Sequence, residues 1–371
     1  MPGSAGNRRG EEDDGLRFSS IWDVDEDGPD ADVGGRDGAA GSGGRSWAGV
    51  SVRPPVQGAV PFPFERLETA ARALAGLDQR LAERGVRRRW FAAMRRRSAA
   101  DQGRLCGFPV DVADACLIQW DPLAPGQSRH NGLWVVARGL KALRLVQRRT
   151  RARPPEAEQV GEIGAAALGR WSSNADRGAA AVCGRWQGLA EDDERGLLVF
   201  CEALGFMGSW PGLDVEERAV LMGTLSPWLA RAFVPTRWCC GYLMREIAWA
   251  PALWERAARE GGDAWVDRCL AAVAACAGSG HNVLRQLELR HGLALRASPA
   301  RRKSHSYERA VDHLFECPVV DVQSLMRALG LSRAGAQRLI GELVRAGLLS
   351  ASSRGRSRRY SAWKIAEDGA G

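Results

Sequence analysis

Three polar side chains near the C-terminal end of the chain combine residue types and spacing that suit base recognition. Arg333, Gln337 and Arg338 fall within SRAGAQRLIGELVRAG, where a helix would place all three on its outer face. Arginine can bond bidentately to O6 and N7 of guanine, and glutamine to N6 and N7 of adenine. We therefore expect these side chains to read base edges in a DNA major groove. Arg345, near the helix end, is expected to bond only the last carbonyls of the helix.

A second group of cations follows in the segment SSRGRSRRY. Its β-prone flanks, with Gly355 between them, predict a wing, which is a turn joining two short strands. Arginines at such a tip suit phosphates or a minor groove. We assign this role to Arg354, Arg356, Arg358 and Arg359. Tyr360 and Trp363 alternate with polar residues and are expected to hold the wing against the helices.

Helix boundaries in this region predict a helix–turn–helix. Residues 306–318 are predicted to form a first helix, and a second begins with Asp321 as N-cap and ends at Gly330. A third helix, 332–346, is capped by Ser332, which we also count among the DNA contacts. The side chains expected to face the core are Val322, Leu325, Met326, Leu329, Leu331, Ala336, Leu339, Ile340, Leu343 and Val344.

The charge of the chain is concentrated in the same segment. The 371 residues have a net charge of +8, and residues 301–365 hold 13 Lys or Arg against 5 Asp or Glu. Residues 1–300 hold 39 and 37. The codon bias of a GC-rich genome would explain an excess of arginine over lysine, but it would spread the charge evenly. The concentration therefore favours a polyanionic partner for this segment.

The residues that precede this segment have mostly helical patterns. Apolar residues at three- and four-residue steps predict an amphipathic helix over 60–85, and 86–102 is predicted as a second helix rimmed by arginines. Residues 131–150 carry a strong apolar stripe, whereas 110–120 fits a helix or a strand. Further on, Asp214 and Glu217 have the spacing of a capping box.

Tryptophans are frequent in the middle of the chain, where they could line a ligand pocket or pack between helices. We favour packing, because aromatic side chains dominate helical cores. The segments 263–278 and 281–297 are predicted to form two separate helices. The fold class is thus mainly α, with a helical body followed by a C-terminal winged helix–turn–helix domain and preceded by a disordered tail. The predicted domains are an acidic, glycine-rich tail over 1–58, an N-terminal helical domain over 59–153, a tryptophan-rich helical domain over 160–297 and the winged domain over 303–365.

Motifs for catalysis are missing from the sequence. No GxxxxGK[ST], HExxH or GxSxG pattern occurs, and no Cys/His pair has ligand spacing. We therefore expect no enzyme, no cofactor and no metal. The nine cysteines form no CxxC pair and are expected to be reduced, buried side chains. The N-terminal segment has no apolar stretch typical of a signal peptide, and no apolar run is long enough to span a membrane, so we expect a cytoplasmic protein.

Three stretches resemble a known family: VPFPFERLETAARALAGLDQRL, RHNGLWVVARGLKALRLVQRR and PVVDVQSLMRALGLSRAGAQRLIGELVRAGLL, the last continued by GRSRRYSAWKI. The family is bacterial and common on rhizobial and other alphaproteobacterial plasmids. In its members a C-terminal helix–turn–helix DNA-binding domain follows a domain of unknown function. The proline-led first helix is similar to the N-terminal segment of Fic proteins, and the tail is similar to the winged helix that ends many of them. The Fic motif HPFxxGNGR is missing, so the resemblance does not imply AMP transfer.

The sequence therefore predicts a protein that binds double-stranded DNA, a transcriptional regulator. A single recognition helix covers one half-site, so we expect a homodimer. The helical body would dimerise, bind a partner or sense a small molecule. Two alternatives remain open. The winged unit could contact protein, which would make the chain an interaction adaptor, or the body could be a non-catalytic Fic-like relic.

Overall fold

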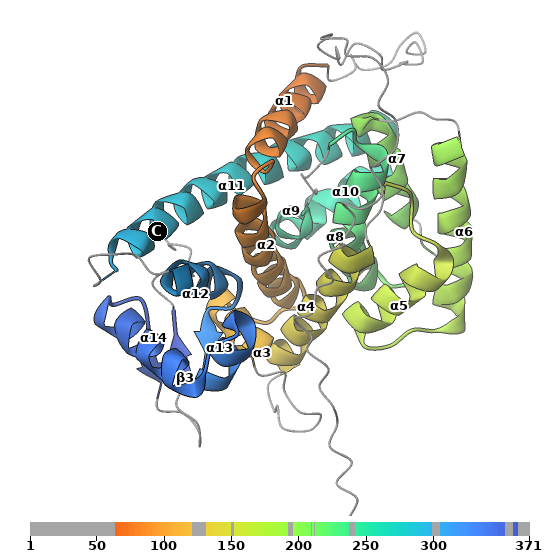
Figure 1. Ribbon diagram of the computed structural model, residues 1–371. Coiled ribbons are helices and arrows are strands. Elements are labelled where there is room, and N and C mark those ends of the chain that lie inside the picture. Colours follow the sequence, from red (N-terminus) through yellow and green to blue (C-terminus); the bar gives the residue numbers. More distant parts are fainter. Residues whose placement is uncertain are drawn as a thin grey trace, which may run out of the picture. The chain divides into compact units, whose positions relative to one another are not determined.

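The computed structural model describes residues 64–120, 131–149, 152–191, 196–208, 210, 212–236, 242–298, 305–352 and 359–362. Within these ranges the chain forms fourteen α-helices and three short strands, which confirms a mainly α fold with a winged unit at its C-terminal end (Figure 1). The tail predicted over 1–58 lies outside the described residues.

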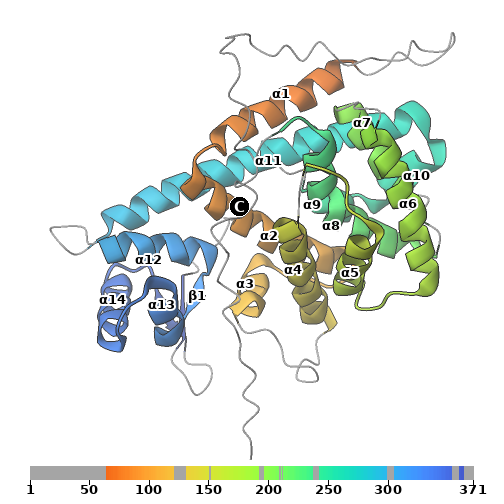
Figure 2. The same cartoon turned by 45° about the vertical axis from the view of Figure 1, so that its right-hand side comes forward.

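The body begins with the helices α1 (Phe64–Arg80), α2 (Arg84–Leu105), α3 (Val112–Trp120) and α4 (Asn131–Arg149). The amphipathic pattern of 60–85 gives α1, whose Leu74 and Leu77 are buried. Figures 1 and 2 show α1 lying along the long helix α11 (Gly262–Arg296). The segment 110–120, which fits a helix or a strand by sequence, forms the helix α3.

Six helices connect α4 with α11: α5 (Ala157–Leu168), α6 (Ser173–Glu191), α7 (Leu197–Gly208), α8 (Val215–Phe233), α9 (Met244–Trp249) and α10 (Pro251–Glu260). The predicted capping box begins α8. The N–H of Glu217 donates to Asp214 Oδ1 at 2.8 Å, and the N–H of Asp214 donates to Glu217 Oε2 at 3.1 Å. These bonds satisfy donors that the first turn of a helix leaves without partners.

The helix α11 is continuous over 35 residues, so the prediction of two helices with a break after 278 is wrong. Gly280 is a contact point between helices. A Cβ atom there would lie 2.7 Å from Leu77 Cδ2, and the Gly280 carbonyl accepts a hydrogen bond from Trp90 Nε1 at 3.2 Å. The glycine therefore allows α1 and α2 to approach α11 closely, and it does not end the helix.

Tryptophans fill much of the core. Trp90, Trp186, Trp210 and Trp228 are each at most 1% exposed. Their indole N–H groups donate to backbone carbonyls, for example Trp186 to Ala203 at 2.8 Å. A buried indole needs such an acceptor for its single donor. For these four residues, packing between helices is confirmed.

The winged unit consists of α12 (His305–Glu316), β1 (Val319–Val320), α13 (Val322–Leu329), α14 (Arg333–Arg345), β2 (Ser350–Ser352) and β3 (Arg359–Ser361). Its antiparallel sheet has the order β1–β3–β2, with Tyr360 paired to Val320 on one side and to Ala351 on the other. The sequence predicts β2 and β3 but misses β1, because two residues are too few to show a period.

Buried residues from all parts of the described chain form one hydrophobic cluster. Leu74 of α1, Leu204 of α7 and Leu325 of α13 all belong to it. The three predicted folded domains, 59–153, 160–297 and 303–365, thus contribute to a shared core. Their boundaries stay predictions.

Candidate nucleic-acid interface

Two short polar side chains begin the helices of the helix–turn–helix. Asp321 Oδ1 accepts the N–H of Ser324 at 2.6 Å, and Ser332 Oγ accepts the N–H of Gly335 at 3.1 Å. Between the helices, Gly330 has φ 68° and ψ 33°, in the left-handed region that glycine enters without strain. The predicted caps and the predicted turn are therefore confirmed, and together they set where α13 ends and α14 begins.

The outer face of α14 is polar and open. Arg333, Ala334, Gln337 and Arg338 are all exposed. In the part of the chain that the structure describes, neither arginine nor Gln337 has a hydrogen-bond or ion-pair partner. Ser332 is also exposed, although its hydroxyl oxygen already accepts the Gly335 N–H. The structure thus brings the three predicted base-reading side chains to one surface.

The inner face of α14 packs against α13. Ala336, Leu339, Ile340 and Leu343 are buried, as predicted. Val344 is 39% exposed, so its predicted inward position is wrong. Each residue turns about 100° around a helix, and Val344 follows the fully buried Leu343, so it falls at the edge of the apolar stripe.

The last turn of α14 holds the remaining cation of this helix. Arg345 Nε donates to the Gly341 carbonyl at 3.2 Å. The side chain thus bonds within its own helix, but Gly341 lies just before the last four carbonyls of α14, so the prediction that Arg345 satisfies those carbonyls is not confirmed. Arg345 is therefore less available than Arg333 or Arg338 for another partner.

Most of the wing lies outside the described residues. This applies to Arg354, Arg356 and Arg358 and also to Trp363. Arg359 begins β3, but only its backbone is described. Tyr360 is half-buried and packs against the hydrophobic cluster, as predicted. The two strands that would carry the wing are in place.

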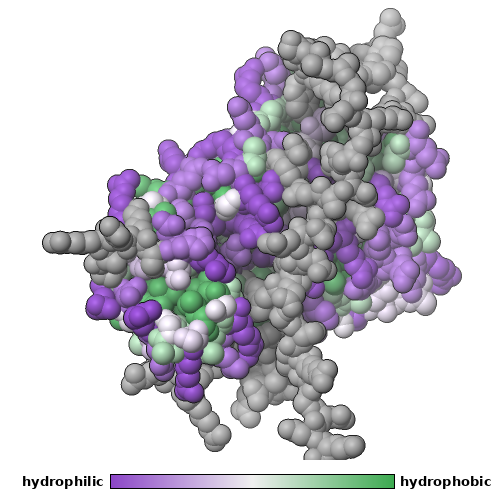
Figure 3. Space-filling view, viewed as in Figure 1, coloured by the Kyte–Doolittle hydropathy of each residue, from purple (hydrophilic) through white to green (hydrophobic). Residues whose placement is uncertain are grey.

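Apolar side chains also reach the surface of the winged unit. Figure 3 shows hydrophobic residues gathered low on the left, where Figure 1 places α12, α13 and α14. In the same unit Val344 is exposed, and Met326, Leu331 and Leu348 are only partly buried. The surface of this unit therefore combines cationic and apolar side chains.

One buried arginine of the body holds the end of α12. Arg96 of α2 is 1% exposed, and its Nη1 and Nη2 donate to the carbonyls of Glu316 and Phe315, both at 2.9 Å. These are the last carbonyls of α12, where the helix dipole is negative. A cation at this position satisfies unpaired acceptors and interacts favourably with the dipole. We call this contact the Arg96 clamp.

A carboxylate on α12 forms a second junction with the body. Asp312 Oδ1 accepts a hydrogen bond from Arg89 Nη1 at 2.8 Å and lies 2.8 Å from His291 Nε2. Burial alone would raise the pKa of Asp312, but the hydrogen bond from His291 and the charge of Arg89 outweigh it and lower that pKa. Asp312 is therefore ionised at neutral pH and links α12 to both α2 and α11.

Two further contacts complete the attachment of α12. The Tyr307 hydroxyl donates to the Ala294 carbonyl at 3.2 Å, and the His291 ring packs edge-on against Phe315 at 5.5 Å. Burial lowers the pKa of His313 to about 4, so this side chain is neutral at pH 7. The first helix of the winged unit is thus fixed to α2 and α11 by polar and aromatic contacts.

Sequence reasoning missed the arginines that make these contacts. The prediction that arginines rim the helix 86–102 is wrong for Arg89 and Arg96, which are both buried. The two are seven residues apart, on the face that also carries Trp90 and Ala93. Because this spacing places both arginines on the apolar face of the helix, it indicates that they are buried. Their acceptors lie more than two hundred residues further along the chain and could not be identified from the sequence.

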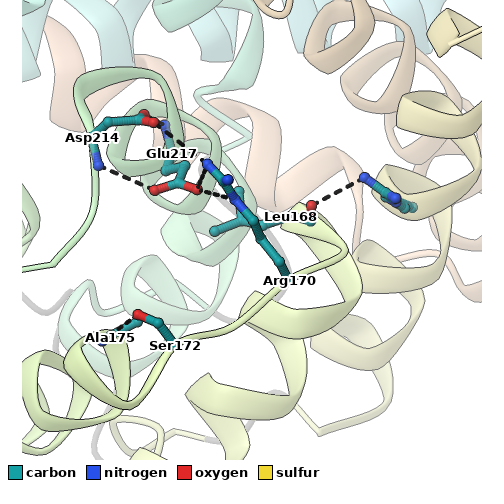
Figure 4. A network of polar contacts seen from close by, with 7 residues as sticks. Leu168, Arg170, Ser172, Ala175, Asp214 and Glu217 are labelled. Atoms are coloured by element: carbon teal, nitrogen blue, oxygen red, sulfur yellow. Dashed lines mark hydrogen bonds and ion pairs between the residues drawn. The ribbon is translucent and has the colours of Figure 1, made fainter.

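A cavity of about 470 Å³ in the helical body is lined by several titratable groups. In Figure 4, Arg170 contacts Glu217, which also completes the capping box with Asp214. Cys106 lines the same cavity, and burial followed by the nearby Glu216 raises the pKa of its thiol to about 12. The thiol is therefore protonated at neutral pH and is a poor nucleophile.

One more sequence prediction concerns the cysteines. In the described ranges Cys116, Cys183, Cys201, Cys269, Cys276 and Cys317 are buried, as predicted, and Cys106 is half-buried; none of these seven is in a disulfide. No group of three or more His, Cys, Asp or Glu side chains within those ranges could hold a metal ion. The same ranges contain no helix with both the length and the apolar character needed to cross a membrane.

Comparison with known proteins shows a distant similarity in structure. No protein-family model matches the chain, and no curated protein matches it. The crystal structure of a Fic family protein from Desulfovibrio desulfuricans G20 is similar over 84% of this chain and 98% of that chain, with a TM-score of 0.41 and 12% identity. The similarity to Fic proteins is therefore distant, and the resemblance to a plasmid-associated family stays a prediction.

Proposed function

We propose that the chain binds double-stranded DNA through its winged unit and acts as a transcriptional regulator. In this proposal α14 enters the major groove, and Arg333, Gln337 and Arg338 bond to base edges. The observation that supports it is the outer face of α14, where these three side chains are exposed and have no partner among the described residues.

Phosphate contacts would come from both ends of the motif. Ser332 lies at the N-terminus of α14, where the positive end of the helix dipole favours an anion. The wing arginines Arg354, Arg356, Arg358 and Arg359 would neutralise phosphates and add affinity that falls with salt. The excess of basic over acidic residues in 301–365 supports this division of roles.

The proposal includes a homodimer and no catalytic step. One helix of this length reads a single half-site, and two half-sites are usually needed for a specific affinity. The operator would then be a palindrome whose half-sites lie about one helical turn apart.

An adaptor is the second candidate function. The exposed Val344 and the hydrophobic surface over the winged unit in Figure 3 favour a protein partner at this position. Salt distinguishes the two candidates, because DNA binding through many phosphates weakens steeply with salt and an apolar contact does not.

Selection from random-sequence duplex DNA with the full-length chain, followed by a salt titration, tests the proposal. We expect enrichment of one palindromic site and a steep loss of affinity with salt. Arg285, an exposed residue of α11, offers a control, because Arg285→Ala also removes one positive charge but lies outside the winged unit. Arg285→Ala should leave the selected site unchanged.

Two other outcomes would change the assignment. Binding without enrichment would mean that the winged unit contacts phosphates only and that the base-reading roles are wrong. No binding at low salt by a folded chain would overturn DNA binding and leave the adaptor as the better candidate.

A further inference from the structure

A second cavity lies in the helical body and is mainly apolar. It has a volume of about 390 Å³ and is bounded by α7, α8, α9, α10 and α11. Buried Met207, Met222, Ile247, Trp254 and Trp265 form its floor. Small-molecule sites in proteins have this size and are lined largely by apolar and aromatic side chains.

Both tryptophans that line the cavity already have an acceptor for their indole N–H. Their rings meet edge to face, with centroids 5.5 Å apart. The Trp254 indole donates to the Glu246 carbonyl at 3.1 Å, and the Trp265 indole donates to the Cys201 carbonyl at 2.7 Å. With both donors already bonded, this wall suits an aromatic ring, which also packs well against the methionine sulfurs.

The mouth of the cavity carries charge. Arg218 is half-buried there, and its guanidinium has no hydrogen-bond or ion-pair partner among the described residues. Arg259 donates only its Nε, to the Glu255 carbonyl at 3.4 Å. Glu255 also lines the cavity, so its charged lining residues are two arginines and one glutamate. The net charge favours a monoanionic group on the ligand, and a guanidinium binds a carboxylate bidentately.

The glycine at the end of α7 keeps the cavity open. A Cβ atom at Gly208 would lie 3.9 Å from Ala258 Cβ and 4.0 Å from the Trp265 ring. Alanine would therefore fit in ordinary contact, whereas a larger side chain would extend into the space beside Trp265. This position permits a matched pair of substitutions.

We propose that this cavity binds an aromatic monocarboxylate, with the ring against Trp254 and Trp265 and the carboxylate on Arg218. The site is separate from the winged unit and does not depend on DNA binding. A ligand of this class would be the small molecule that the helical body senses.

Calorimetric titration of the full-length chain, without DNA, tests this site. The probes are 4-phenylbutanoate, its neutral amide and the corresponding primary ammonium compound, which share the ring and differ in the head group. We expect the carboxylate to bind about tenfold more tightly than the amide, because only the carboxylate can form a charge-assisted hydrogen bond with Arg218. We expect no binding of the ammonium compound.

Variants assign the binding to this cavity. Arg218→Gln should weaken carboxylate binding about tenfold and leave amide binding unchanged, since only the charged contact is lost. Gly208→Leu should abolish binding of both, whereas Gly208→Ala and the distant Arg285→Gln should bind as the wild type does. Circular dichroism and thermal unfolding would check that each variant is folded.

Several results would overturn the proposal. These are equal affinities for carboxylate and amide, an unchanged affinity in Arg218→Gln, or no binding of the carboxylate at millimolar concentration. If Gly208→Leu fails to fold, the comparison of Arg218→Gln with the wild type still tests the proposal, because Arg218→Gln leaves the apolar floor of the cavity intact. A failure of DNA binding would not affect any of these measurements.

Discussion

Arginine has three distinct roles in this chain, and its surroundings decide which one applies. Arg338 is exposed without a partner among the described residues, Arg96 is buried against carbonyls, and Arg345 bonds a carbonyl of its own helix. The same type of side chain is therefore exposed and open to a partner, links two helices or bonds within its own helix. Counting arginines alone cannot separate these roles.

Substitution of single arginines would separate base contacts from phosphate contacts. Arg338→Ala should cost about 1–3 kcal/mol of binding free energy at the selected site and relax the preference at one base pair. Arg356→Ala should weaken binding to all sequences and reduce the slope of log K against log salt by about one. Binding assays over a panel of single-base variants and salt concentrations would measure both. A change of base preference in Arg356→Ala would mean that the contacts were assigned wrongly.

His313 makes stability depend on pH. Its pKa is about 4 in the folded protein, below the ordinary value of about 6.5, so the unfolded chain takes up the proton first as pH falls. This lowers the free energy of unfolding between pH 6.5 and 4 by about 1.4 kcal/mol per pH unit. His313→Gln should lose that dependence. When the pH is lowered from 7.5 to 5, the free energy of unfolding of the variant should therefore rise by about 2 kcal/mol relative to that of the wild type.

Urea unfolding of both proteins at the two pH values would measure this difference. Burial raises the pKa of Glu316, which acts in the opposite direction, so the comparison with the variant is needed and the wild-type curve alone is not enough. His305→Gln, at an exposed position, serves as the control. Parallel pH dependence of His313→Gln and wild type would show that His313 already takes up its proton in the folded state.

At the scale of elements, the helices depend on close packing more than on their local signals. The helix α11 runs through Gly278 and Gly280, although glycine is a poor helix former. Gly278 is exposed with no atom near its missing Cβ, whereas Gly280 is buried against Leu77. Close packing therefore requires glycine at position 280 of this helix but not at position 278.

Alanine substitutions at these glycines should have opposite effects. Gly278→Ala should stabilise the protein by about 0.5–1 kcal/mol, because alanine favours the helix. Gly280→Ala should destabilise it by about 1–2 kcal/mol, since overpacking against Leu77 exceeds the gain in helix propensity. Chemical unfolding of both variants would measure the effects. Equal stabilisation would mean that α1 can move away from α11 at no cost.

Most of the local structure could be predicted from the sequence, and most of the long-range contacts could not. The caps at Asp214, Asp321 and Ser332 follow from residue type and spacing, and so does the exposed face of α14. The continuity of α11 and the burial of Arg96 depend on partners far along the chain. A pattern within one helix carries no information on the helix that will pack against it.

At the scale of the whole described fold, the winged unit is attached to the body mainly through α12, and β1 also lies against α3. The Arg96 clamp, the Asp312 junction and the Tyr307 hydroxyl all lie on this helix. None of these contacts involves α13 or α14. The outer face of α14 therefore takes no part in these three contacts.

Removing the clamp should loosen this attachment. Arg96→Met keeps the volume of the side chain but leaves the carbonyls of Phe315 and Glu316 without their donors, so we expect a loss of about 2 kcal/mol in the free energy of unfolding. Hydrogen exchange should show less protection for the amides of α12. Arg84→Met, at an exposed position of the same helix, should leave both quantities unchanged. Unaltered exchange in α12 of Arg96→Met would show that the other contacts suffice.

The Arg96 clamp has a consequence for how such chains can diversify. Arg96 bonds two main-chain carbonyls, which every residue type possesses, so these two bonds place no demand on which side chains stand at 315 and 316. Winged units with other recognition residues could therefore be exchanged onto the same body by recombination, provided that their first helix ends at the same place. The body would keep its packing while the outer surface of the winged unit changed.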